Sequence, residues 1–259
     1  MPGLRKLLKW IAVPVGLWLL FQLGKLLLLL FPQPAFSYRL EYQNYRIYSD
    51  APLDSTIQAL FDDVEQRNRA IPIYQPGKTW TVFLCRDLER YGFYAELSGL
   101  AKFSQGFNLV LANRIFISLT FIESVHARFG PAYRHSLLEG SAAHIISHEI
   151  FHSCIAETLG FWRARALPSW KVEGYAEYAA TRHAIRSDSS DSFRARLSRL
   201  FEPGFLAAYP LRRHYYQSQL LVEFLSEVKG LNFAAIMGDG TNEAETLEAL
   251  RAWYNSNSD

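Results

Sequence analysis

The sequence has little cysteine, little excess charge and no internal repeat, and each shortage narrows the class of protein. Its 259 residues include only two cysteines, Cys85 and Cys154, which lack the spacing of a CxxC motif. They cannot form a disulfide framework. They could pair with each other, but we expect two buried thiols. The formal net charge is only +2, so no basic face dominates and we expect no nucleic-acid partner.

Charge is almost absent from one N-terminal run, Trp10 to Phe31, in which Lys25 is the only charged residue. As a helix this run spans roughly 33 Å, which matches a bilayer core of about 30 Å. Lys25 lies near the far end, where a lysine side chain can extend toward the interface. The run therefore predicts a transmembrane segment over residues 10–31.

The residues around this segment predict its orientation. Residues 1–9 form a basic stub that contains Arg5, Lys6 and Lys9, and basic residues favour the cytoplasmic side. We expect an uncleaved signal anchor, with residues 35–259 forming a periplasmic or extracellular domain. A signal peptide cleaved near Ala35 is the alternative.

The pattern after the anchor predicts an α+β fold with two halves. Alternating and short apolar segments predict strands within a strand-containing half of about 38–122. Residues 38–50 form a strand pair or one long strand, 79–85 form one strand, and 107–121 form two strands joined at Ala112 and Asn113 or one long bent strand. That half also includes expected helices at 53–71 and 86–97, the second broken by Gly92. An all-helical half of about 136–255 follows, with helices expected at 135–160, 169–185, 193–200, 215–229 and 241–254 and a polar loop at 187–192. We expect the functional site between the two halves.

The segment HEIFH, His148 to His152, carries the clearest chemistry. Residues four apart on an α-helix differ by about 40° in direction and about 6 Å in height, so the two imidazoles share one face. Zinc accepts imidazole nitrogens at about 2.0–2.1 Å and leaves a position open for water in catalytic sites. Glu149 lies at the edge of that face, where it can take a proton from such a water. This pattern on a helix is typical of zinc peptidases.

The residues around the motif favour a metal over a coincidence. Five apolar side chains make the helix suitable for burial: Ile145, Ile146, Ile150, Phe151 and Ile155. Burying two histidines and a glutamate without partners would cost several kcal/mol.

His144 extends the histidine series by one more turn. Three successive turns span about 12 Å, which one ion cannot easily bridge. We therefore expect His144 beside the ligands or in the packing of the helix.

The segment PSWKVEGYAEY, Pro168 to Tyr178, follows and supplies two carboxylates on one helix face, Glu173 and Glu177. HExxH followed by WxxEGxAEY resembles the gluzincin metallopeptidases, which include the thermolysin-like and peptidase MA-like domains. The resemblance implies that Glu173, before the glycine, is the third zinc ligand and that Glu177 orients the first histidine. Twenty residues separate His152 from Glu173, close to but not identical with the family spacing.

The resemblance extends more loosely over residues 108–230. The helix from Tyr215 to Gly230 is similar to the YxQS…VxYL helix of peptidase MA-like domains, and it implies that Tyr215 holds the oxyanion, with Tyr216 and His214 behind it. Residues 108–118 could form an edge strand that aligns a peptide substrate. Arg212 and Arg213 are near enough to contact an acidic group, whereas we expect Arg194, Arg196 and Arg199 to lie on a solvated face.

The sequence therefore predicts a membrane-anchored zinc metallopeptidase that acts on a peptide or protein. One Zn²⁺ per chain would be bound by His148, His152 and Glu173, with Glu149 as the base. The rival hypothesis is a non-proteolytic protein in which the same ligands stabilise a binding or scaffold domain. A membrane scaffold without metal is the third, and it requires both motifs to be accidental.

Overall fold

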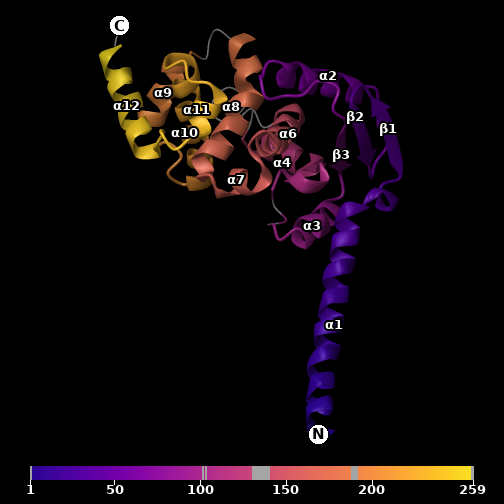
Figure 1. The fold of residues 1–259 in the computed structure, drawn as a ribbon. Helices are drawn as coiled ribbons and strands as arrows, with labels where there is room; N and C mark the ends of the chain where they lie inside the picture. Colours follow the sequence, from indigo (N-terminus) through magenta and orange to yellow (C-terminus); the bar gives the residue numbers. More distant parts are fainter. Residues whose placement is uncertain (1, 101, 103, 130–140, 188–191, 258–259) are drawn as a thin grey trace.

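The structure is a computed structural model that describes residues 2–100, 102, 104–129, 141–187 and 192–257. It has a mixed α+β architecture, as expected from the sequence. Figure 1 shows a long N-terminal helix, α1 (Pro2–Leu30), that projects from a domain containing one sheet and many helices. Within α1, Val13–Leu30 is long and apolar enough to cross a membrane, and a signal sequence would pass the same test.

The sheet has five strands in the order β1-β2-β3-β5-β4. The strands are β1 (Tyr38–Tyr42), β2 (Tyr45–Ser49), β3 (Trp80–Cys85), β4 (Gly106–Leu109) and β5 (Arg114–Ser118). β2, β3 and β5 run parallel, whereas the edge strands β1 and β4 are antiparallel to their neighbours. Every residue of β3 is buried, as a strand covered on both faces requires.

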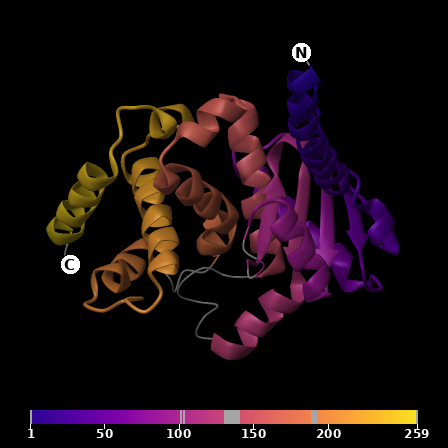
Figure 2. The same ribbon diagram turned by 90° about the horizontal axis from the view of Figure 1, so that it is seen from below.

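Helices cover both sides of the sheet and then continue away from it (Figures 1 and 2). Those of the strand-containing part are η1 (Gln33–Ala35), α2 (Thr56–Arg69), α3 (Leu88–Leu97), η2 (Val110–Ala112) and α4 (Leu119–Phe129). Those of the helical part are α6 (Ala142–Leu159), α7 (Phe161–Ala166), α8 (Ser169–Ser187), α9 (Phe193–Phe201), α10 (Pro210–Glu223), the π-helix η3 (Phe224–Val228), α11 (Phe233–Met237) and α12 (Glu243–Ser256).

Helix α6 links the two parts, because it packs on β4, β5 and α2 on one side and on α8 on the other. The Ser141 hydroxyl accepts a hydrogen bond from the backbone N–H of His144 and so caps the start of α6. Gly160 ends the helix with a φ of 86°, a conformation that glycine adopts without strain. Because nearly all of α6 is buried, its polar side chains must find partners inside the protein.

Several local predictions were wrong. Gly92 does not break α3, which runs through it. The segment 107–121 does contain two strands joined near Ala112 and Asn113, one of the two arrangements expected, with η2 between them and Asn113 in the left-handed region at φ 50°. Its last residues begin α4, which was not predicted. Of the two strands in this segment, which was expected to form an edge strand, β4 lies at an edge of the sheet and β5 lies between β3 and β4. Helices α7 and α11 were not predicted. The interior of the expected loop at 187–192 lies outside the described residues.

Both cysteines are free and buried, as predicted. Cys85 lies in β3 and Cys154 in α6, and each thiol is surrounded by apolar side chains. Burial raises the pKa of Cys154 to about 12, so this thiol is not reactive at neutral pH.

Candidate metal centre

Helices α6 and α8 bring three predicted ligands together. His148 Nε2 and His152 Nε2 lie 3.0 Å apart, and Glu173 Oε2 of α8 lies 3.3 Å from the first and 3.5 Å from the second. Together these three residues form a group that could hold a metal ion. Two ligands of a tetrahedral zinc, each bonded at about 2.0–2.1 Å, are themselves about 3.3 Å apart. The triangle of atoms therefore has the size that zinc requires.

The donor chemistry of this group also fits a cation. Glu173 Oε2 is buried, and no residue that the structure describes gives it a well-formed hydrogen bond. A buried carboxylate oxygen without a partner is costly. A divalent cation between Glu173 and the two imidazoles would satisfy it.

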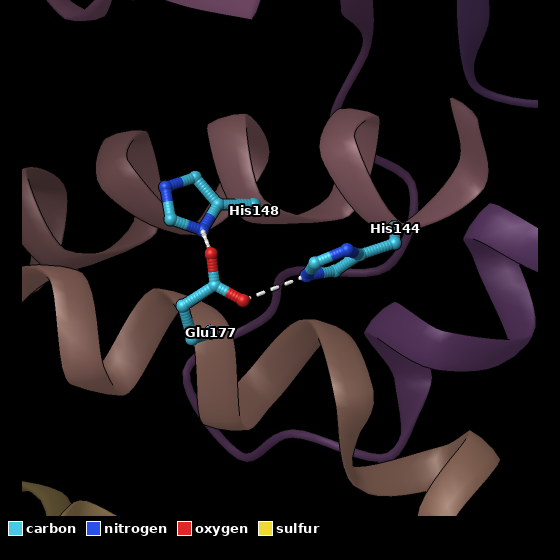
Figure 3. A group of neighbouring side chains, drawn as sticks. All are labelled: His144, His148 and Glu177. Carbon is cyan, nitrogen blue, oxygen red and sulfur yellow. Dashed lines mark hydrogen bonds and ion pairs between the residues drawn. The ribbon is translucent and has the colours of Figure 1, made fainter. Parts of the chain in front are cut away.

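A second group, drawn in Figure 3, shares His148 with the first. It consists of His144, His148 and Glu177, all buried, and it could also hold a metal ion. The Glu177 carboxylate lies between the imidazoles: Oε2 is 2.8 Å from His144 Nε2 and Oε1 is 3.1 Å from His148 Nδ1. His148 is shared, with Nδ1 toward Glu177 and Nε2 toward His152 and Glu173.

Distances and exposure separate the two groups. The 2.8 Å contact of Glu177 with His144 is the length of a hydrogen bond, and it is shorter than the roughly 3.3 Å between tetrahedral zinc ligands. His144 is fully buried, so that group offers no open position for a substrate. His152 and Glu173 are partly exposed instead, as an accessible centre requires.

The two carboxylates of this centre, Glu173 and Glu177, favour a positively charged partner. Burial alone would raise the pKa of Glu177, but the charges and hydrogen bonds of His144 and His148 lower it to about 2. For Glu173, burial is likewise outweighed by His152 and His148, which hold its pKa well below the usual range. Burial would lower the pKa of His148, yet the two carboxylates raise it well above the ordinary value. Two carboxylates thus stay ionised and draw positive charge to the point where the imidazoles meet.

Glu149 lies in the same turn of α6 and is 8% exposed. Burial raises its pKa, against the opposing effect of His152 and His148. A carboxylate with a raised pKa accepts a proton more readily than an ordinary carboxylate does. The backbone of this turn is held by Asn108 of β4, whose side-chain amide donates to the Glu149 carbonyl and, at 2.8 Å, to the Ser153 hydroxyl.

Tyr215 faces the centre from α10. Its ring centroid lies 6.2 Å from that of His148. Burial and the nearby carboxylates of Glu173, Glu177 and Glu149 raise the pKa of its phenol. The phenol therefore remains protonated and can donate a hydrogen bond.

The two residues expected behind Tyr215 have other contacts. Tyr216 is buried, and its hydroxyl donates to the Arg196 carbonyl at 3.0 Å. His214 lies 3.2 Å from the Ser169 hydroxyl, at the start of α8. Tyr216 thus belongs to the packing of α9 on α10.

The expectation of a solvated arginine face was wrong for Arg196. It is buried and forms a bidentate ion pair with Glu223 of α10, with contacts of 2.7 and 2.5 Å. Arg194 donates to the carbonyls of Tyr254 and Asn257 instead. The predicted role of Arg212 in binding an acidic group stays a prediction. Its guanidinium lies over the Tyr209 ring, 5.9 Å from the centroid.

Two positioning features were not predicted from the sequence. One is the Asn108 bridge between β4 and α6, and the other is Gly174, directly after Glu173. A Cβ added at Gly174 would lie 2.4 Å from the Ser218 carbonyl oxygen of α10. Gly174 therefore lets α8 and α10 approach closely, which places Tyr215 beside Glu173. The glycine of the EG pair was the available signal for this contact.

Comparison with known proteins gives no relative, since no protein-family model matches the chain and no curated protein matches it.

Proposed function

We propose that the chain is a membrane-anchored zinc metallopeptidase of the gluzincin type. One Zn²⁺ would be bound by His148, His152 and Glu173. The N-terminus would be cytoplasmic, and α1 would hold a periplasmic or extracellular catalytic domain. The observation that carries the proposal is the triangle of 3.0, 3.3 and 3.5 Å between His148 Nε2, His152 Nε2 and Glu173 Oε2, with a buried Glu149 beside it.

The surrounding residues supply the other requirements of peptide hydrolysis. Zinc bound in this position would polarise the scissile carbonyl and acidify a water. Glu149 would take the proton from the attacking water and pass it to the leaving amine. Tyr215 would donate a hydrogen bond to the developing oxyanion. Glu177 would fix the His148 ring by accepting from Nδ1, while His144 would hold Glu177 from its other side.

The position of β4 supports a peptide as the substrate. β4 is an edge strand and packs on α6. Edge strands can bind an extended peptide through backbone hydrogen bonds. A substrate chain added to β4 would therefore lie along the helix that carries His148 and Glu149.

Two substitutions test the assigned roles in the full-length protein, purified in detergent. Glu149→Gln should retain about one zinc per chain but lose hydrolysis of a peptide library by a factor on the order of 10³ or more. His148→Ala should lose both zinc and hydrolysis. Full activity in Glu149→Gln would refute the base.

The same measurements separate the rival functions. A wild-type protein that contains stoichiometric zinc but cleaves no peptide would favour the non-proteolytic binding or scaffold protein. No stoichiometric zinc in the wild-type protein would favour a scaffold without metal.

A further inference from the structure

Helix α1 is not loosely tethered to the domain. Leu29 and Phe36 are buried against the aromatic cluster on one face of the sheet. Arg114 of β5 donates from Nε to the Leu30 carbonyl at 2.9 Å, and Arg90 of α3 donates to the Ala35 carbonyl. The apolar run ends at this point of the chain. Elements α3 and β5 therefore lie at the depth where a membrane crossed by α1 would end.

Exposed apolar side chains gather on the elements around this junction. They are Phe31 (61% exposed) after α1, Phe93 (47%) on α3, Leu100 (47%) after α3 and Leu111 (78%) in η2, next to β5. Scattered exposed apolar residues need no explanation, but a group around a membrane helix does.

Helix α7 adds a different chemistry to the same side of the molecule. Figure 1 shows α3 and α7 on the side of the domain from which α1 descends. Trp162 of α7 is 79% exposed, more than any other large apolar side chain among the described residues. Arg163 and Arg165 of the same helix are also exposed. Tryptophan favours the headgroup level of a bilayer, where arginine can bind phosphate oxygens.

We propose that this face rests on the bilayer that α1 crosses, with Phe93 and Trp162 inserted at the headgroup level. The partner is the lipid surface itself, because α3 contacts the end of α1 and must therefore lie close to the lipid that α1 crosses. The charge of α3 is partly balanced, since Glu96 pairs with Lys102 at 2.9 Å, so no strongly anionic membrane is required. The inference rests on the proposed membrane anchor but not on the proposed hydrolysis.

Site-specific fluorescence tests the proposal with the full-length chain. The variants Phe93→Cys and Trp162→Cys are labelled with a nitrobenzoxadiazole thiol probe, since Cys85 and Cys154 are buried. The proteins are reconstituted in vesicles of phosphatidylcholine and phosphatidylglycerol, with or without lipid spin-labelled near the headgroup. Ala59→Cys is the matched control, because Ala59 is exposed on α2, on the side opposite to α1 (Figure 1). Leu20→Cys in α1 reports insertion of the anchor.

We expect spin-labelled lipid to quench the probes at positions 93 and 162 several-fold more than the probe at 59. Quenching at either position no greater than at 59 would overturn the proposal, because both helices define the face. A blue-shifted probe that lipid does not quench would overturn it in favour of a protein partner. A probe at Leu20 that emits as it does in water would remove the anchor and this inference together, because position 20 lies at the middle of the proposed span. Zinc content and peptidase activity of the same preparations report independently on the proposed hydrolysis.

Discussion

At the scale of single residues, His148 connects the two groups that could hold a metal ion. It presents Nε2 to His152 and Glu173 and Nδ1 to Glu177. A neutral imidazole has one protonated nitrogen and one free lone pair. With a metal bound at Nε2, the remaining proton of the His148 ring would lie on Nδ1, which faces the Glu177 carboxylate at 3.1 Å.

Replacing Glu177 by glutamine tests this contact. Glu177→Gln keeps the shape of the side chain but removes the charge shared by His144 and His148, so zinc affinity should fall by about 10–100-fold. The affinity is measured by competition with a chelator of known strength. Glu157→Gln is a matched control, because Glu157 is exposed on α6 and pairs with Lys78. Equal affinities in both variants would show that Glu177 does not orient the ligand.

The predicted ligands could be placed from the sequence because helical spacing is local. HEIFH puts His148 and His152 on one face whatever the rest of the fold does. Asn108 could not be recognised as a support of α6. Its contact with the Glu149 carbonyl joins residues 41 positions apart, and no local pattern encodes such a distance. Arg196 was misjudged for the same reason, since its partner Glu223 comes from another helix.

At the scale of elements, the centre depends on how closely α8 packs against α10. The Ser218 backbone of α10 occupies the space that a side chain at position 174 of α8 would need. Helix α8 carries Glu173 and Glu177, and α10 carries Tyr215. A change in the distance between these helices would therefore move the proposed ligand Glu173 and the proposed oxyanion donor Tyr215 together.

Two glycine substitutions separate this close approach from helix propensity. Gly174→Ala places a methyl group against backbone atoms of α10, and such overpacking should cost about 1–3 kcal/mol of unfolding free energy. Among the described residues, a Cβ added at Gly92 in α3 would meet the Lys102 side chain, at 3.2 Å, and no backbone atom of another helix. There the better helix propensity of alanine should leave stability unchanged or raise it by about 0.5–1 kcal/mol.

Denaturant unfolding and zinc titration of both variants provide the measurement. Gly174→Ala should also bind zinc more weakly, because Glu173 is the preceding residue. A Gly174→Ala protein as stable as Gly92→Ala would contradict the close approach.

The elements that were not predicted depend on tertiary packing. Helix α7 has six residues, which is too short to be stable alone. The expected helix at 215–229 begins earlier, at Pro210, and ends in the π-helix η3. The strand pair β1–β2 and helix α2 were predicted because their alternation and helical periodicity are complete within the segment.

At the scale of the whole molecule, the centre lies where the sheet and the helical part meet in one continuous hydrophobic core. Helix α6 lies between the sheet and the helical part, and it carries His148 and His152. A cation shared with Glu173 of α8 would join the two parts at one point. Binding only to the folded state raises stability by mass action.

Metal removal should therefore lower the melting temperature of the full-length protein. At free zinc about 100 times the dissociation constant the stabilisation is about 2.7 kcal/mol, or roughly 5–10 °C for a domain of this size. Differential scanning fluorimetry with and without EDTA measures the shift, and added zinc should restore it. In His152→Ala the melting temperature should not respond to EDTA. If the melting temperature of the wild-type protein also does not change with EDTA, this would argue against a bound metal.

The junction between α1 and the domain has a consequence for substrate choice. Residues 33–35 form η1 and Phe36 is buried, so the connection between the membrane helix and the sheet is short and structured. The proposed catalytic centre would stand at a constant height above the lipid. A polypeptide that emerges from the same bilayer would then be cut according to how many extended residues, at about 3.3 Å each, reach that height. Such an enzyme would select the bond to cleave by its distance from the membrane, and less by the side chains beside that bond.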